Sequence, residues 1–334
     1  MKNKLKILSL TIMAISMGAC STQKSDSYSE KTIKVMSFNI RNSDADDEIN
    51  NWNQGRKERA IALINAYKPD IFGVQEAKAG THGDQISDLK ALPNYTWYGV
   101  GRNDGREAGE FEGILYLEKR FSLVKSGEFW LSPTPDKPGT TFSTSDMNPS
   151  WDIGNPRMAT WLILHDKLNN IDLLVVNQHW AVTSATQKNS AILLRSMIEK
   201  LDTNTDKMPV IVMGDFNMTD ESKDNKYSLN PQDAYSVILN GESVDSKLKL
   251  IDAYRSLYPK KDGEMTFHGF HGGTSYYDTK TDPSDIAYNN RIDFIFTSPD
   301  LKCISAEIIR KRFSDKQGEW PSDHYPVLTT FTLE

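Results

Sequence analysis

The chain combines many short strand-like runs with few helix-like ones, and this ratio most constrains its fold. Ten runs are short, rich in β-branched or aromatic residues and bounded by Gly, Pro, Asn or Asp, as strands are. The predicted strands are Thr32–Ile40, Asp70–Gln75, Glu112–Leu117, Phe121–Leu131, Met158–Leu164, Ile171–His179, Val210–Gly214, Arg291–Thr297, Cys303–Arg310 and Pro326–Thr332. The predicted helices are Gly55–Tyr67, Asp84–Leu92, Ser184–Leu201 and Pro231–Asn240.

This ratio indicates an α/β fold in which mixed sheets carry helices on their outer faces. Nothing that resembles a linker interrupts residues 31–334, so we expect one domain there, with two packed sheets. Two long segments, Ser132–Pro156 and Asp262–Asn290, are rich in Pro, Gly, Asp, Thr and Tyr. Loops of that length in a compact domain are often binding or lid elements.

The N-terminus has the pattern of a secretory signal, because three lysines within the first six residues precede the apolar stretch Ile7–Ala19. At ~1.5 Å per residue this stretch covers only ~20 Å, which is less than the ~30 Å core of a bilayer. Met17-Gly18-Ala19-Cys20 resembles a bacterial lipoprotein cleavage site, with Met where Leu is more usual. The resemblance implies a lipid on Cys20; ordinary signal cleavage nearby is the alternative.

We therefore expect a lipoprotein signal peptide at residues 1–19, a flexible tether at 20–30 and a folded domain at 31–334. The lipid on Cys20 would attach the protein to a membrane of the cell envelope, facing the periplasm or the outer surface. Cys303 would then have no disulfide partner. Its strand-like surroundings predict a buried, inert thiol.

The charge balance argues against some classes of partner. The chain has 39 Lys and Arg against 45 Asp and Glu, and the signal holds three Lys and no acid, so the rest has 36 against 45, net −9. An acidic chain has no general attraction to nucleic acid, whose tight non-specific binding depends on phosphate neutralisation. Net charge does not locate the positive side chains, so nucleic acid stays possible beside a small phosphorylated molecule or a lipid head group.

Polar side chains gather at the ends of several predicted strands. These clusters are Ser37-Phe38-Asn39, Gln75-Glu76, Asn177-Gln178-His179, Gly214-Asp215-Phe216-Asn217, Arg291-Ile292-Asp293 and Ser322-Asp323-His324-Tyr325-Pro326. If these ends converge, they form a cleft with carboxylates, carboxamides and two histidines. Each cluster alone is equally compatible with a turn, a helix cap or a loop entering an edge strand.

This set of side chains suits the hydrolysis of a phosphoester with the help of a metal ion. Mg²⁺ takes oxygen ligands and keeps several waters, so one to three carboxylates or amides suffice, whereas zinc prefers clustered His or Cys. A bound cation neutralises phosphate charge and lowers the pKa of an attacking water. An Asp or His can take the proton, while amide and imidazolium donors stabilise the developing charge.

Together the six clusters resemble the motifs of the endonuclease/exonuclease/phosphatase superfamily of metal-dependent phosphohydrolases. They occur in the family's order and span residues 36 to 326. The resemblance implies a four-layer α/β sandwich with two mixed β-sheets face to face, flanked by helices. It also implies Mg²⁺ or Mn²⁺ as the cofactor.

The resemblance also assigns roles. Glu76 would be the main metal ligand, with Asn39 and Asp323 completing or flanking the site. Asp215 would align or deprotonate the attacking water, and Asn217 would hold the phosphate or the nucleophile. His179 and His324 would bind phosphate oxygens or shuttle protons, and Asp293 would orient the ring of His324. Motif matching does not settle which group is the general base, so the pair Asp215 and His324 would share that role.

Two further residues are candidates for binding substrate. Arg157 could place a guanidinium fork on a phosphate, or form a surface ion pair. In the segment Thr266–Gly273, His268 or His271 could contact substrate, or the segment could be a glycine-rich loop with solvent-facing histidines. The segment Gly101–Gly105 could be a second substrate loop, although a simple turn explains it.

One departure from the family concerns substrate handling. Bacterial relatives often continue past the equivalent of His179 with Phe-Asp-His, whereas Trp180-Ala181-Val182 follows here. The expected activity is hydrolysis of a phosphoester, mono- or diester, in the bacterial envelope. The alternative is a non-catalytic lipoprotein that binds a ligand or partner on the same fold, and retention of Glu76 and the other catalytic candidates argues against it.

Overall fold

The computed structural model describes residues 31–138, 156–182, 184–201, 208–220, 232–241, 246–274 and 290–334. The predicted signal peptide at 1–19, the tether at 20–30 with Cys20, and most of the two long loops lie outside these residues. Within the described residues, no helix is both long and apolar enough to cross a membrane.

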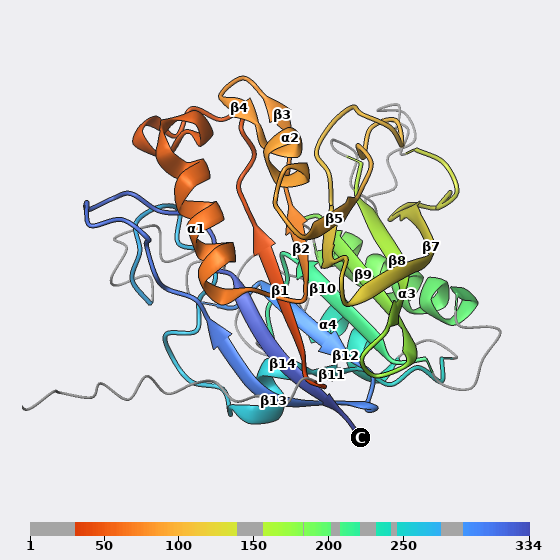
Figure 1. Cartoon of the computed structure of the whole chain (residues 1–334). Helices are drawn as coiled ribbons and strands as arrows, with labels where there is room; N and C mark the ends of the chain where they lie inside the picture. Colours follow the sequence, from red (N-terminus) through yellow and green to blue (C-terminus); the bar gives the residue numbers. More distant parts are fainter. Residues whose placement is uncertain are drawn as a thin grey trace, which may run out of the picture.

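Two six-stranded mixed sheets form the centre of the structure (Figure 1). The first has the order β13 (Leu301–Ile308), β14 (Val327–Leu333), β1 (Ile33–Asn39), β2 (Ile71–Gln75), β6 (Ile114–Leu117) and β5 (Tyr95–Tyr98). The second has the order β11 (Ile251–Asp252), β12 (Asp293–Thr297), β10 (Val210–Asp215), β9 (Ile171–His179), β8 (Met158–Asp166) and β7 (Phe121–Trp130). In each sheet one central pair is parallel, β1 with β2 and β9 with β10.

Five helices and a small hairpin complete the described fold. The helices are α1 (Lys57–Tyr67), α2 (Gln85–Lys90), α3 (Ser184–Leu201), α4 (Gln232–Asn240) and α5 (Ala253–Leu257). The hairpin pairs β3 (Ala79–Gly80) with β4 (Gly83–Asp84), and short helical turns at Glu48–Asn50 and Trp52–Arg56 precede α1.

Alternating side chains on the strands separate three apolar layers. On β1, Val35 faces the second sheet and joins the core between the sheets, while Met36 and Phe38 face α1 and α2. On the other side, the outward residues of β9, β10 and β12 pack against α3 and α4. Figure 1 shows α1 and α3 on opposite sides of the molecule. Two sheets between two helical layers make a four-layer sandwich, which confirms the predicted fold class.

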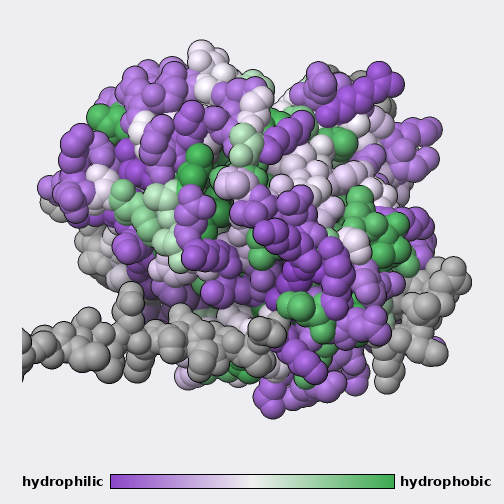
Figure 2. Space-filling view, viewed as in Figure 1, coloured by the Kyte–Doolittle hydropathy of each residue, from purple (hydrophilic) through white to green (hydrophobic). Residues whose placement is uncertain are grey.

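Hydrophilic residues dominate the face seen in Figure 2, and apolar residues form separate small patches on it. All ten predicted strands and four predicted helices are present, with ends that shift by a few residues. For example, β12 begins at Asp293, and Arg291 precedes it. The short elements β3, β4, β5, β11 and α5 were not predicted, because two to five residues carry too little periodic signal. Cys303 is buried as predicted, and burial raises the pKa of its thiol to about 11.

Candidate active site

Strand pairing brings the predicted polar clusters to one edge of the sandwich. The parallel pairs end together, so that Asn39 lies beside Gln75, which precedes Glu76, and His179 lies beside Asp215. The strand β12 runs antiparallel to β10, so its first residue, Asp293, lies opposite Asp215. The C-terminal ends of four strands and the start of a fifth therefore converge.

A cavity of about 410 Å³ opens at this edge. Most of the predicted site residues line it, namely Glu76, Arg157, His179, Asp215, Asn217, Asp323 and His324. Asn39 and Asp293 lie directly behind the wall, hydrogen-bonded to residues that form it. The sequence-predicted catalytic and metal-binding residues are thus brought together.

His268 is placed differently. Its ring is fully buried and stacks on Tyr325 at 4.0 Å between ring centroids, with Trp320 at 4.7 Å. The neighbouring Phe267 lines the cavity instead. Burial lowers the pKa of His268 well below its usual value, so the ring is neutral. The backbone N–H groups of His268 and Gly269 donate to the carbonyl of Asp323, so this segment positions the Asp323 loop.

Glu76 is held by a cradle of amide donors. The Asn39 side chain donates to its Oε1 at 3.0 Å, and the backbone and side-chain N–H groups of Asn42 donate to its Oε2 at 3.1 and 3.0 Å. Burial alone would raise the pKa of Glu76, but the positive charge of His324 and the Asn39 hydrogen bond hold it well below its usual range. Glu76 is therefore a fixed carboxylate.

Asn39 also donates to Oδ2 of Asp215 at 3.0 Å, while its own Oδ1 accepts from the backbone N–H of Arg41. In this arrangement Asn39 positions two carboxylates with its amide nitrogen, and its role as a metal ligand stays a prediction. Asp323 accepts from the Ser322 hydroxyl at 3.2 Å and lies 3.7 Å from the Arg41 guanidinium. Burial raises the pKa of Asp323.

Asp293 and Asp215 lie on opposite sides of the His324 ring, and we call these three residues the relay. Asp293 Oδ2 lies 2.9 Å from Nδ1 of His324, whose Nε2 lies 3.8 Å from Oδ2 of Asp215. Burial would lower the pKa of His324, but Asp293 and Asp215 outweigh it and raise the pKa to about 10. Burial and the charge of Asp293 raise the pKa of Asp215 to about 7. An imidazolium and a carboxyl group that titrates near neutrality thus face each other.

His179 stands between two groups of acids. Its Nε2 lies 3.6 Å from Asp215 Oδ2, and its Nδ1 lies 3.9 Å from Glu110 Oε2. Burial and the positive charge of Arg157 lower the pKa of His179 well below its usual value, although Glu76 opposes them. The ring is therefore neutral.

The backbone around the acids is constrained. Glu76 and Asn217 have φ values of 63° and 49°, in the left-handed region that few non-glycine residues occupy. Gly214 has φ of 152°, and a Cβ there would lie 2.0 Å from the carbonyl oxygen of Gln178. Glycine is thus required before Asp215, and the Asn217 backbone N–H then donates to Asp215 Oδ1 at 2.9 Å.

Several residues of the site were not singled out from the sequence. The cavity wall includes Arg41, Asn42, Arg102 and Glu110. Arg41 and Asn42 follow the Asn39 cluster directly, so proximity to that motif was an available signal. Arg102 lies in the glycine-bounded segment that could equally have been a simple turn.

The acidic side chains could hold a cation. One ligand atom from each of Glu76, Asp215 and His324 lies within 4.8 Å of the others. The half-buried, ionised Glu76, with Asp215 and Asp323 near it, offers the oxygen ligands that a hard divalent cation requires, whereas the protonated His324 is not a ligand. The residues therefore fit such an ion.

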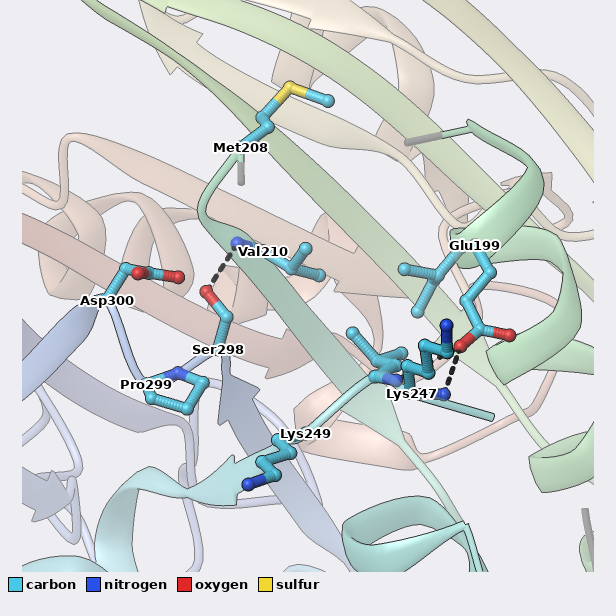
Figure 3. Close-up of a pocket in the computed structure, with 10 residues that line it drawn as sticks. Glu199, Met208, Val210, Lys247, Lys249, Ser298, Pro299 and Asp300 are labelled. Carbon is cyan, nitrogen blue, oxygen red and sulfur yellow. Dashed lines mark hydrogen bonds between the residues drawn. The ribbon is translucent and has the colours of Figure 1, made fainter. Parts of the chain in front are cut away.

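A larger cavity of about 770 Å³ lies elsewhere, between the end of α3 and the start of β10 (Figure 3). In it, Glu199 accepts from the backbone N–H of Lys247, and Ser298 accepts from the backbone N–H of Val210. Among the described residues, its lining includes no histidine, and the catalytic candidates lie at the other cavity.

Comparison with known proteins places the chain in a family. The model of the endonuclease/exonuclease/phosphatase family matches residues 36–324. An endonuclease/exonuclease/phosphatase structure from Bacteroides vulgatus is 31% identical, with a TM-score of 0.70 over 91% of this chain and 99% of that one. A mannosyl-6-phosphatase from Bacteroides thetaiotaomicron is 27% identical, with a TM-score of 0.69 over 90% of this chain and 100% of that one.

The catalytic domain of human nocturnin, at 19% identity and a TM-score of 0.63 over 91% of this chain and 95% of that one, shares the fold. No match was found among curated proteins. The family model spans nearly all of the described domain and includes every cluster at the cavity from Asn39 to His324. The chain therefore belongs to the endonuclease/exonuclease/phosphatase family.

Proposed function

We propose that this protein hydrolyses phosphoesters with Mg²⁺ or Mn²⁺, by in-line attack of water on phosphorus. The observation that carries the proposal is the relay from Asp293 through His324 to Asp215, whose Asp215 and His324 ends lie close to the Glu76 carboxylate in the wall of one open cavity. A cation held by Glu76, with Asp323 beside it, would neutralise phosphate charge and polarise the phosphoryl group.

The protein's own groups divide the proton chemistry. Asp215, whose pKa of about 7 lies near neutrality, accepts the proton of the attacking water. The imidazolium of His324 donates a hydrogen bond from Nε2 to a phosphoryl oxygen, and Asp293 holds that charge in place. The new bond forms between water oxygen and phosphorus, the ester P–O bond breaks, and the leaving oxygen takes up a proton from solvent, to which Asp215 returns the proton that it accepted.

The substrate that fits best is a small phosphomonoester such as a sugar phosphate. The cavity is about 410 Å³, and three cationic side chains, Arg41, Arg102 and Arg157, line it. The net charge of −9 on residues 20–334 disfavours long polyanions outside the cleft. A relative at 27% identity is named a mannosyl-6-phosphatase, which favours this class.

A substrate panel tests the proposal. Purified protein with Mg²⁺ is offered hexose phosphates, phospholipid head-group esters, a chromogenic phosphodiester and single-stranded DNA, and phosphate release or strand cleavage is measured. We expect turnover of a sugar phosphate that chelation abolishes. Asp215→Asn and His324→Gln should each lower kcat by roughly 10²-fold or more.

Matched controls come from an acid–histidine pair outside the cavity. His165 and Asp172 lie 2.8 Å apart and are partly exposed, so His165→Gln and Asp172→Asn should leave kcat unchanged. Turnover of DNA or lipid esters alone would contradict the substrate class. No turnover on the whole panel would instead favour a non-catalytic binding lipoprotein.

We also propose that Cys20 carries a lipid that holds the protein on a membrane of the cell envelope. The support is the cleavage-site pattern Met17-Gly18-Ala19-Cys20 after a basic and apolar start. Membrane fractionation and labelling with a fatty-acid analogue test it. Cys20→Ser should abolish labelling and move the protein to the soluble fraction, and unchanged partitioning would refute the anchor.

A further inference from the structure

A second group of ligand-type side chains lies on the other side of His179. One atom from each of Glu110, Glu112 and His179 lies within 4.8 Å of the others. Glu112 is fully buried and His179 is 5% exposed. Among the described residues, neither carboxylate oxygen of Glu112 has a hydrogen-bond partner, and neither does Nδ1 of His179.

The buried carboxyl group of Glu112 has no hydrogen-bonded cation, although Arg102 and Arg157 both place positive charge near it. Arg102 reaches both acids, with Nη1 at 2.6 Å from Glu110 Oε2 and at 3.9 Å from Glu112 Oε1. Arg102 therefore pairs with the half-buried Glu110, and its contact with the buried Glu112 is longer than a hydrogen bond. A buried carboxylate with no donor is costly, since it loses hydration and gains no partner.

We propose that Glu110, Glu112 and His179 form a second divalent-cation site, distinct from the Glu76 cluster, for an ion such as Mn²⁺ or Zn²⁺. A donor set of two carboxylates and one imidazole suits these ions better than Mg²⁺, because they accept nitrogen ligands readily. The cation would bind the Glu112 oxygens and the Nδ1 of His179, which have no hydrogen-bond partner among the described residues.

The contact of the other ring nitrogen of His179, Nε2, supports this role. Its Nε2 lies 3.6 Å from Asp215 Oδ2, so the ring can present Nε2–H to a carboxylate while Nδ1 faces the two glutamates. Metal-binding histidines commonly carry a carboxylate on the second nitrogen, which fixes the tautomer and the ring orientation. The two clusters would thus be joined through one imidazole.

Metal binding can be measured without any substrate, so the inference stands or falls independently of the proposed function. The full chain is stripped with a chelator, and Mn²⁺ is titrated in while free Mn²⁺ is followed by electron paramagnetic resonance. We expect two Mn²⁺ per chain in the wild type and one in Glu112→Gln. Glu76→Gln should also bind one, through the remaining cluster.

The ligand type provides an independent readout. In the Glu76→Gln protein, pulsed resonance of the bound Mn²⁺ should show coupling to a directly bound imidazole nitrogen, and Glu110→Gln in that background should abolish it. Two Mn²⁺ in a folded Glu112→Gln protein, or no ion in Glu76→Gln, would overturn the second site. If Glu112→Gln does not fold, as judged by circular dichroism, the imidazole coupling decides alone.

Discussion

Asn177 joins the two sheets next to the active site, and replacing it tests how the site is held together. The side-chain amide of Asn177, on β9, donates to the carbonyl oxygens of Val74 at 2.8 Å and Gly113 at 2.9 Å in the first sheet. Its Oδ1 accepts from Nε2 of Gln75 at 2.6 Å. Both partners of this last bond are fully buried. Glu76 follows Gln75 directly and His179 lies two residues after Asn177, and both of these residues line the active-site cavity.

The change Asn177→Leu keeps a similar shape and removes all three hydrogen bonds. The Gly113 carbonyl still accepts from the Val74 backbone N–H at 2.9 Å, so two groups lose a partner, the Val74 carbonyl and one N–H of Gln75. Each such buried polar group costs about 1–3 kcal/mol, which predicts a loss of roughly 2–6 kcal/mol in the free energy of unfolding. Because a domain is stable by only about 5–15 kcal/mol, such a loss is large. The side chain at position 177 has room only because residue 73 is glycine: a Cβ on Gly73 would lie 2.6 Å from the Asn177 carboxamide.

Urea unfolding followed by tryptophan fluorescence measures this loss. Asn53→Leu, at an exposed position in the helical turn Trp52–Arg56 before α1, is the control and should change stability by less than about 0.5 kcal/mol. Adding Gln75→Met to Asn177→Leu should cost less than the sum of the single changes, because the unsatisfied amide donor is removed with its partner. A loss below about 1 kcal/mol in Asn177→Leu would refute the reasoning.

Three further predictions concern single groups. Gly214→Ala places a Cβ against the Gln178 carbonyl and should lower Tm and activity together; an unchanged Tm would contradict the strain. In metal-free protein, the pKa of His324 is raised from 6.5 to about 10, so its stabilising charge is fully present below pH 6.5 and lost as the pH rises through 10. The unfolding free energy of the wild type should therefore fall more steeply over that range than that of His324→Gln, and parallel curves would count against the relay. In the Cys20→Ser protein, Cys303 should react with a thiol reagent at neutral pH only after unfolding, since burial raises its pKa to about 11, and rapid labelling of folded protein would contradict this.

The strand-end residues could be predicted from the sequence because local patterns carry the necessary information. Asp215 ends an apolar run, Asn217 follows it, and pairing of parallel strands then brings such ends together without further detail. The roles of the side chains could not be predicted in the same way. His268 lies in a glycine-rich segment that suggests exposure, yet its ring stacks on Tyr325 and contacts Trp320, which follow it by more than fifty residues.

The Glu110–Glu112 pair shows a different limit of sequence reasoning. Its spacing of two residues places both side chains on one face of an extended segment, and this much is visible in the sequence. That the face meets His179 depends on tertiary contacts: Phe111 bridges to both Ala77 and Gly101, which turns the two glutamates toward the end of β9. Arg102 reaches them because its own backbone N–H donates to the carbonyl of Glu110. An acid pair therefore becomes a candidate ligand set only when the fold supplies a third donor, and here the third donor is a histidine that the motif had already assigned to phosphate.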